Sequence, residues 1–213
     1  MELLSLFITS FIVGFSGALM PGPLLAVDIA ETPLKGARTG PIITGGHALA
    51  EIAVVVLLSI GLAAVVSENK AIGQAIGVIG GGMLIFMGFG MLNELRKTGA
   101  TAQQSSSKSK GSGRLVFDGI IASISNPYWF VWWATTGSAF LIKSLKHGVA
   151  GPTVFYFGHI LSDLVWYSLV SVLIWKGRRL IGGTGYKILI GICAIFLLYL
   201  GGRFIYDGIT GAI

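Results

Sequence analysis

The feature that most constrains this chain is a long stretch without charged side chains near its start. No charged residue occurs from Leu3 to Val27, and about 20 apolar residues are enough to cross the hydrocarbon core of a membrane. The end of this stretch contains Pro21-Gly22-Pro23, where each proline removes a backbone donor and clashes with the carbonyl one turn back. In lipid, the freed carbonyl groups need partners inside the protein. We therefore expect a broken membrane helix that faces the protein interior.

The composition favours a polytopic membrane protein over a soluble domain. Of the 213 residues, 54% are hydrophobic and 11% are charged, whereas soluble domains carry roughly 25% charged residues. We assign the net charge of +6 to loops that set the membrane topology, and not to nucleic-acid binding. The single cysteine, Cys193, excludes an intramolecular disulfide and a thiol redox pair.

The apolar blocks predict an all-α bundle of six membrane spans that forms one domain over residues 1–213. A Ser-, Gly- and Lys-rich stretch at about 93–114 separates two sets of three spans, and we interpret it as a flexible cytoplasmic linker. The first and fourth spans are expected to be broken, at Pro21 and at Asn126-Pro127. The predicted spans cover about 3–29, 40–66, 71–92, 115–142, 151–175 and 186–206.

The basic residues are distributed unevenly between the two sides of the predicted membrane. Eleven of the 15 Lys and Arg residues follow spans one, three and five, and the other four lie toward the opposite side. Cytoplasmic loops are enriched in Lys and Arg. The sequence therefore predicts a multi-pass protein of the plasma membrane with both termini outside.

The two halves of the chain repeat a short motif. Gly46-His47 is followed by Glu51, and Gly158-His159 is followed by Asp163, at the same spacing and 112 residues later. The two proline breaks also occupy corresponding places. Because each half holds three spans, the second half must enter the membrane from the opposite side, which gives an inverted repeat as in many transporters. We place repeat 1 at about 1–92 and repeat 2 at about 115–213.

Taken together, these features resemble the LysE/RhtB superfamily of amino-acid exporters over nearly the whole chain. The resemblance rests on the Pro-Gly break, Gly36 and Gly40, Asn126-Pro127, and Asp163. It implies a small secondary exporter of amino acids and related solutes, driven by the proton gradient and forming a homodimer. The chain departs from the family in two ways: Tyr128 follows Asn-Pro where many relatives have Lys, and the paired His–acid motif is not general.

The helix breaks are the predicted substrate site. The N-terminus of a half-helix carries partial positive charge that suits a carboxylate, and unpaired carbonyls suit an ammonium group, so an amino acid would use both. The alternative is a pair of proline kinks needed only for packing. The candidate binding residues are Pro21, Gly22, Pro23, Asn126, Pro127 and Tyr128.

The His–acid motifs are the predicted proton-coupling residues. His47 and Glu51 lie four residues apart, as do His159 and Asp163, so each pair shares one helix face. An ionisable group at mid-membrane costs at least ~2.5–3.5 kcal/mol and usually faces an interior cavity. Desolvation favours the neutral form of an acid, which suits proton exchange. Two alternatives stay open: pairs that only fix helix packing, and a divalent-metal exporter that binds its ion with these four residues.

Two further groups have a structural and a functional interpretation. Asp28 and Glu31 either line the cytoplasmic mouth or are ordinary acidic loop residues. The aromatic residues that follow the second break either form an interfacial belt or a cage around an ammonium group. They are Tyr128, Trp129, Phe130, Trp132 and Trp133.

The sequence contains no Walker motif and no GxSxG motif, so neither an ATP-driven pump nor a hydrolase is supported. We expect a protein that is not an enzyme and has no cofactor. Its expected partners are a small-molecule substrate, membrane lipid and a second copy of itself.

Overall fold

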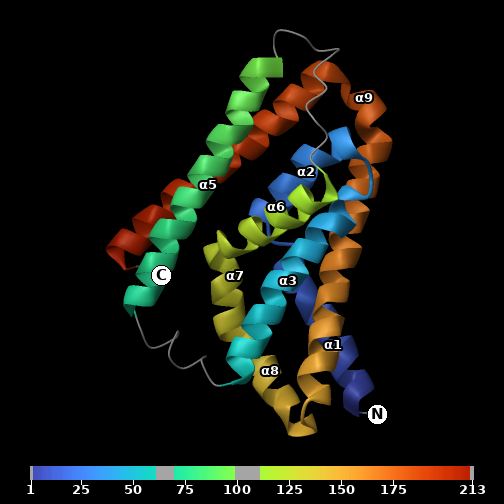
Figure 1. Ribbon diagram of the computed structural model, residues 1–213, viewed down its shortest axis with the longest axis vertical. Coiled ribbons are helices and arrows are strands. Elements are labelled where there is room, and N and C mark those ends of the chain that lie inside the picture. Colours follow the sequence, from blue (N-terminus) through green and yellow to red (C-terminus); the bar gives the residue numbers. More distant parts are fainter. Residues whose placement is uncertain (1, 61–69, 99–110, 212–213) are drawn as a thin grey trace.

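The computed structural model describes residues 2–60, 70–98 and 111–211, and every regular element in these ranges is a helix (Figure 1). Most of the predicted linker and the end of the second predicted span lie outside the described residues. A π-helical turn, Trp133–Gly137, and a 3-10 turn, Leu145–His147, interrupt the later helices. The α-helices are α1 (Glu2–Ala18), α2 (Pro23–Lys35), α3 (Thr39–Ser59), α5 (Lys70–Thr98), α6 (Ser112–Ile124), α7 (Pro127–Trp132), α8 (Ser138–Ser144) and α9 (Ala150–Thr210).

The first predicted break is present. Helix α1 ends at Ala18, α2 begins at Pro23, and the two helices are bent by 79°. Gly22 precedes α2 with an extended backbone, and Pro23 occupies the first helical turn. A proline is well placed there, because the N–H group it lacks would have no partner within the helix and its φ angle already suits the helix.

The second predicted break is also present, between α6 and α7. Ile124 ends α6, and Pro127 is the first residue of α7. The Asn126 side chain caps the new helix, because its Oδ1 accepts a hydrogen bond of 3.1 Å from the backbone N–H of Tyr128. Both breaks therefore arise from proline at a helix start.

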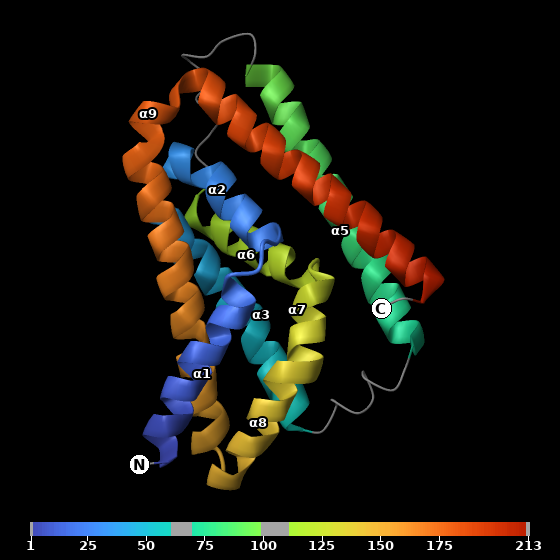
Figure 2. The same cartoon turned by 180° about the vertical axis from the view of Figure 1, so that it is seen from behind.

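The sequence predicted a loop between spans five and six, and this prediction is wrong. Helix α9 runs through it without interruption and is 61 residues long. No proline occurs at 176–185, so nothing removes a backbone donor there. The helix is not straight: its first part and its last part run in different directions (Figures 1 and 2).

Three helical segments are long and apolar enough to cross a membrane: Thr39–Ser59, Ala150–Gly177 and Gly191–Thr210. The bent pair of α1 and α2 qualifies as a fourth if it counts as one span. Within α5, the apolar part Gly77–Asn93 is shorter. The structure therefore gives an all-helical membrane protein, in which the described helices meet this criterion for three or four of the predicted spans.

Glycines bring the helices around the centre close together. A Cβ atom on Gly46 of α3 would collide with the carbonyl oxygen of Val116 of α6, and one on Gly119 of α6 would collide with that of Ile43. Helix α5 lies beside the last part of α9 in both views (Figures 1 and 2). This second pair packs on α2 through a cluster that includes Ala26, Leu84 and Leu197.

Candidate functional site

A small cavity lies between the two helix breaks and helices α3 and α9. Its volume is ≈ 60 Å³, enough for a few water molecules, since about 10–15 Å³ holds one. The lining combines residues of the two breaks with acids, histidines and aromatic rings, and none of the described residues that form it is Lys or Arg. The lining residues are Gly17, Met20, Gly22, Leu24, His47, Glu51, Ala122, Ser123, Asn126, Tyr128, Trp129, Trp132, His159, Asp163 and Tyr167.

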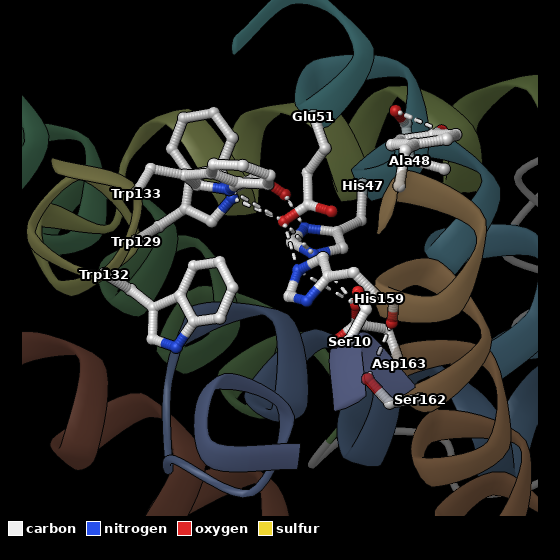
Figure 3. Close-up of polar contacts among 12 residues, drawn as sticks. Ser10, His47, Ala48, Glu51, Trp129, Trp132, Trp133, His159, Ser162 and Asp163 are labelled. Carbon is white, nitrogen blue, oxygen red and sulfur yellow. Dashed lines mark hydrogen bonds and ion pairs between the residues drawn. The ribbon is translucent and has the colours of Figure 1, made fainter. Parts of the chain in front are cut away.

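Glu51 lies at the centre of a buried polar cluster (Figure 3). Four nitrogen atoms surround its Oε1: Nε2 of His47 at 3.1 Å, Nε2 of His159 at 3.1 Å, and the indole Nε1 atoms of Trp129 at 3.1 Å and Trp133 at 3.0 Å. The indole groups only donate hydrogen bonds. This arrangement holds Glu51 as a carboxylate, and its other oxygen, Oε2, is buried without a hydrogen-bond partner.

His47 is fixed at both ring nitrogens. Its Nδ1 lies 2.7 Å from Ser123 Oγ, and that hydroxyl is 2.7 Å from the carbonyl oxygen of Gly119. A hydroxyl has one proton, so a Ser123 hydroxyl that donates to Gly119 accepts from His47 Nδ1. Because Nε2 faces the Glu51 carboxylate, these directions favour a doubly protonated His47 that forms an ion pair with Glu51.

His159 and Asp163 are held less tightly than His47 and Glu51. The Nδ1 atom of His159 and the Oδ2 atom of Asp163 are both buried without a hydrogen-bond partner. Asp163 Oδ2 lies 3.6 Å from His159 Nε2 and 3.8 Å from His47 Nε2, which is beyond good hydrogen-bond range. The two acids of the repeated motif thus differ in their donors: Glu51 Oε1 has four within 3.1 Å, whereas the two histidine nitrogens that face Asp163 Oδ2 lie at 3.6 and 3.8 Å.

The three tryptophans after the second break all lie around the central polar cluster. Trp129 and Trp133 are buried and point their N–H groups at Glu51, while Trp132 stacks on His159 with ring centroids 4.5 Å apart. Trp129 and Trp133 lie four residues apart on one helix face. That spacing is a signal in the sequence, but only the fold brings this face to α3.

Two polar residues of the cavity lining were not predicted, Ser123 and Tyr167. Ser123 follows from no motif, because its role depends on α6 packing against α3 through glycine. Tyr167 lies four residues after Asp163 and lines the same cavity. The repeat of four along α9 would have indicated it.

Only some of the residues predicted at the helix breaks line the cavity. Gly22 and Asn126 both line the cavity and approach each other, since a Cβ atom on Gly22 would lie 3.3 Å from Asn126 Nδ2. Tyr128 also lines it. Pro21 is exposed and Pro23 is buried, and neither is among the lining residues. Pro127 begins α7.

The cluster contains three residues that could ligate a divalent metal. His47, Glu51 and Asp163 each offer one ligand atom within 4.8 Å of the others. However, the indole N–H groups of Trp129 and Trp133 point at Glu51 Oε1, and a cation bound there would face two fixed donors. The donor set therefore fits a proton better than a divalent ion.

Asp28 and Glu31 are not loop residues, because both lie on α2 and are buried. Glu31 forms an ion pair of 3.2 Å with Lys35. Asp28 is fully buried and bonded to hydroxyl groups, so it does not line an open mouth.

Apolar helices of membrane-spanning length around a buried cluster of acids and histidines define a multi-pass membrane protein with an interior polar site. The chain belongs to the LysE type translocator family, whose model matches residues 15–208. This family membership makes it a membrane transport protein for small solutes, and not an enzyme. No curated protein and no solved structure gives a significant match.

Proposed function

We propose that this protein exports an amino acid or a similar small solute across the plasma membrane in exchange for protons. One observation carries the proposal: the two matching His–acid motifs converge on one cavity, where Glu51 Oε2 and Asp163 Oδ2 are both buried without a partner. An unpaired buried carboxylate oxygen is costly. A proton, or the ammonium group of a substrate, would offset that cost.

The part of the cavity beside the helix breaks suits the carboxylate group of an amino acid. Gly22 precedes α2, and the backbone N–H groups of the first turn of a helix have no partner within it. Together with the Asn126 amide, this helix start offers donors and partial positive charge to a carboxylate. A zwitterion would then place its ammonium group at the acids and its carboxylate at the breaks.

The proposed motion is a rocking of two inverted repeats, of about 1–92 and 115–213, around this cavity. Close contacts between helices support such a repeat, because they occur in matching pairs. Each residue of one contact corresponds to a residue of the other contact that lies 109 to 113 positions away in the sequence. Gly46 meets the Val116 carbonyl as Gly158 meets that of Phe7, and Gly88 meets the Ala194 carbonyl as Gly201 meets that of Gly81.

The two acids have separate roles in this mechanism. Glu51 stays charged, because four donors hold it, and it keeps the two histidines in place. Asp163 loads a proton on the outer side and releases it to the cytoplasm, since no donor lies closer to its Oδ2 than the histidine nitrogens at 3.6 and 3.8 Å. The substrate and the proton compete for Asp163, which couples their movements.

Flux in liposomes with an imposed pH gradient tests the proposal. Wild-type protein is compared with Asp163→Asn and Glu51→Gln, using amino acids as the first panel of solutes. We expect Asp163→Asn to abolish gradient-driven export and to keep exchange of labelled for unlabelled substrate. Asp118→Asn is a suitable control, because Asp118 pairs with Arg114 at 2.9 Å, away from the cavity. Undiminished gradient-driven export by Asp163→Asn and Glu51→Gln would remove both acids from the mechanism.

A further inference from the structure

A further buried carboxylate, Asp28, lies away from the central cavity, where α2 meets α9 and the start of α3. Asp28 is fully buried. Its Oδ1 accepts hydrogen bonds from the Thr32 hydroxyl at 2.9 Å and from the Ser171 hydroxyl. The Ser171 oxygen in turn accepts from the backbone N–H of Gly40 at 2.7 Å. Both hydroxyl groups, of Ser171 and Thr32, therefore donate to Asp28 Oδ1.

Because Asp28 only accepts these hydrogen bonds, its carboxylate carries a negative charge that has no counter-ion among the described residues. Asp28 Oδ2 is buried and has no hydrogen-bond partner. Among the residues that the structure describes, no Lys, Arg or His lies within ion-pair distance of Asp28. An isolated carboxylate inside a protein is strongly unfavourable unless a cation or a proton accompanies it.

None of the charged groups on the helices around Asp28 that the structure describes forms an ion pair with it. On α2, Glu31 pairs with Lys35. Arg38 before α3 is exposed, and on α6 Arg114 pairs with Asp118. On α9, Tyr167 packs with Val27 of α2 in one core cluster, and Lys176 is exposed.

Helix α9 joins this place to the central site by a line of buried polar side chains. His159, Asp163, Tyr167 and Ser171 follow one another at intervals of four residues, and all four are buried. Residues four apart share a helix face and are separated by about 6 Å along the axis. The line therefore extends over roughly 18 Å, from the Glu51 cluster to Asp28.

We propose that Asp28, with the hydroxyls of Thr32 and Ser171, is a second cation site of the transporter, which takes a small monovalent cation, H⁺ or Na⁺, at Asp28 Oδ2. The proposal goes beyond the central site, and it holds whichever solute is exported. It implies that one transport cycle involves two cation sites, one at Asp163 and one at Asp28.

Infrared difference spectroscopy on the purified full chain in lipid nanodiscs tests this proposal directly. Spectra are recorded after a pH step at constant Na⁺, and after replacing choline by Na⁺ at constant pH and ionic strength. If the ion is a proton, Asp28→Asn removes a carboxylic-acid band that appears on acidification. If it is sodium, the variant removes a carboxylate shift and a rise in Tm that Na⁺ produces in the wild type.

Three variants make the result decisive. Ser171→Ala keeps the Asp28 charge but removes one hydroxyl that donates to the carboxylate. A proton response should therefore begin at a higher pH than in the wild type, because the charged form has lost a donor, whereas a Na⁺ response should become about tenfold weaker; either shift can be read even if Asp28→Asn folds poorly. Asp118→Asn should change neither response, because Asp118 already has an Arg partner. Asp163→Asn separates the two proposals: if it alone changes the spectrum, the central mechanism stands and the second site fails. Asp28 bands that do not respond to pH or Na⁺ would overturn the second site.

Discussion

At the scale of single residues, Glu51 is held by four donors at one carboxylate oxygen. Two of its four donors are indoles, which cannot rearrange into acceptors. Hydrogen bonds to charged groups contribute about 1.5–3 kcal/mol each. Trp133→Phe should therefore lower the free energy of unfolding by about that amount, since phenylalanine keeps most of the ring but not the N–H group.

Trp132→Phe is the matched control for this variant. The Trp132 indole donates to Ser16 Oγ at 3.1 Å, in an exposed position, and the stacking on His159 survives with a phenyl ring. We expect a loss below about 1 kcal/mol, as for an ordinary neutral hydrogen bond. Thermal unfolding of both variants in the same detergent decides the matter, and equal losses would argue against a charged Glu51.

The candidate site was only partly predictable at this scale. The repeated Gly-His-x3-acid motif indicates His47, Glu51, His159 and Asp163, because i,i+4 spacing needs only the helix period. The partners of these residues come from elsewhere: Trp133 from the far side of a helix break, and Ser123 from α6. No local pattern encodes such contacts, so they depend on the packing of whole helices.

At the scale of helices, the α3 side of the contact between α3 and α6 depends on Gly46 and not on the neighbouring Gly45. A Cβ atom on Gly46 would collide with the Val116 carbonyl, while one on Gly45 would meet nothing within 4 Å. Gly46→Ala should destabilise the protein by about 1–3 kcal/mol through overpacking. Gly45→Ala should be neutral or stabilise it by up to about 1 kcal/mol, through helix propensity. Unfolding temperatures of the pair, measured side by side, check this prediction; equal values would mean that α3 and α6 adjust freely.

The helix breaks were predictable, and the continuity of α9 was not. Pro21, Pro23 and Pro127 remove donors and fix backbone angles locally, so their effect can be read from the sequence. Between Trp175 and Tyr186 the sequence is basic and glycine-containing, which is typical of a loop but does not forbid a helix. There the backbone continues as a helix, and the last part of α9 packs against α5.

At the scale of the whole molecule, the proposed orientation can be tested at two exposed positions. Figure 1 places the α2–α3 turn, the end of α5 and the bend of α9 toward one end, and the N-terminus with the α8–α9 turn at the other. The positive-inside rule assigns the first end to the cytoplasm. In a Cys193→Ala background, an impermeant thiol reagent on intact cells should label Val149→Cys, which is 87% exposed.

Ser112→Cys, which is also exposed but lies at the start of α6 after the predicted cytoplasmic linker, should be labelled only after the cells are opened. The two positions serve as controls for each other, because both need a reactive thiol and an accessible side chain. Labelling of Ser112→Cys, but not of Val149→Cys, in intact cells would reverse the orientation.

The indoles around the central cluster have a consequence for spectroscopy. Trp132 stacks on His159, and Trp129 and Trp133 touch Glu51, so three of the five tryptophans of the chain report on one site. Indole fluorescence is quenched by a nearby imidazolium and shifts in colour when its N–H group loses a charged acceptor. The unlabelled protein therefore carries its own optical probe, and ligand binding or protonation in the cavity can be followed in real time by ultraviolet emission alone.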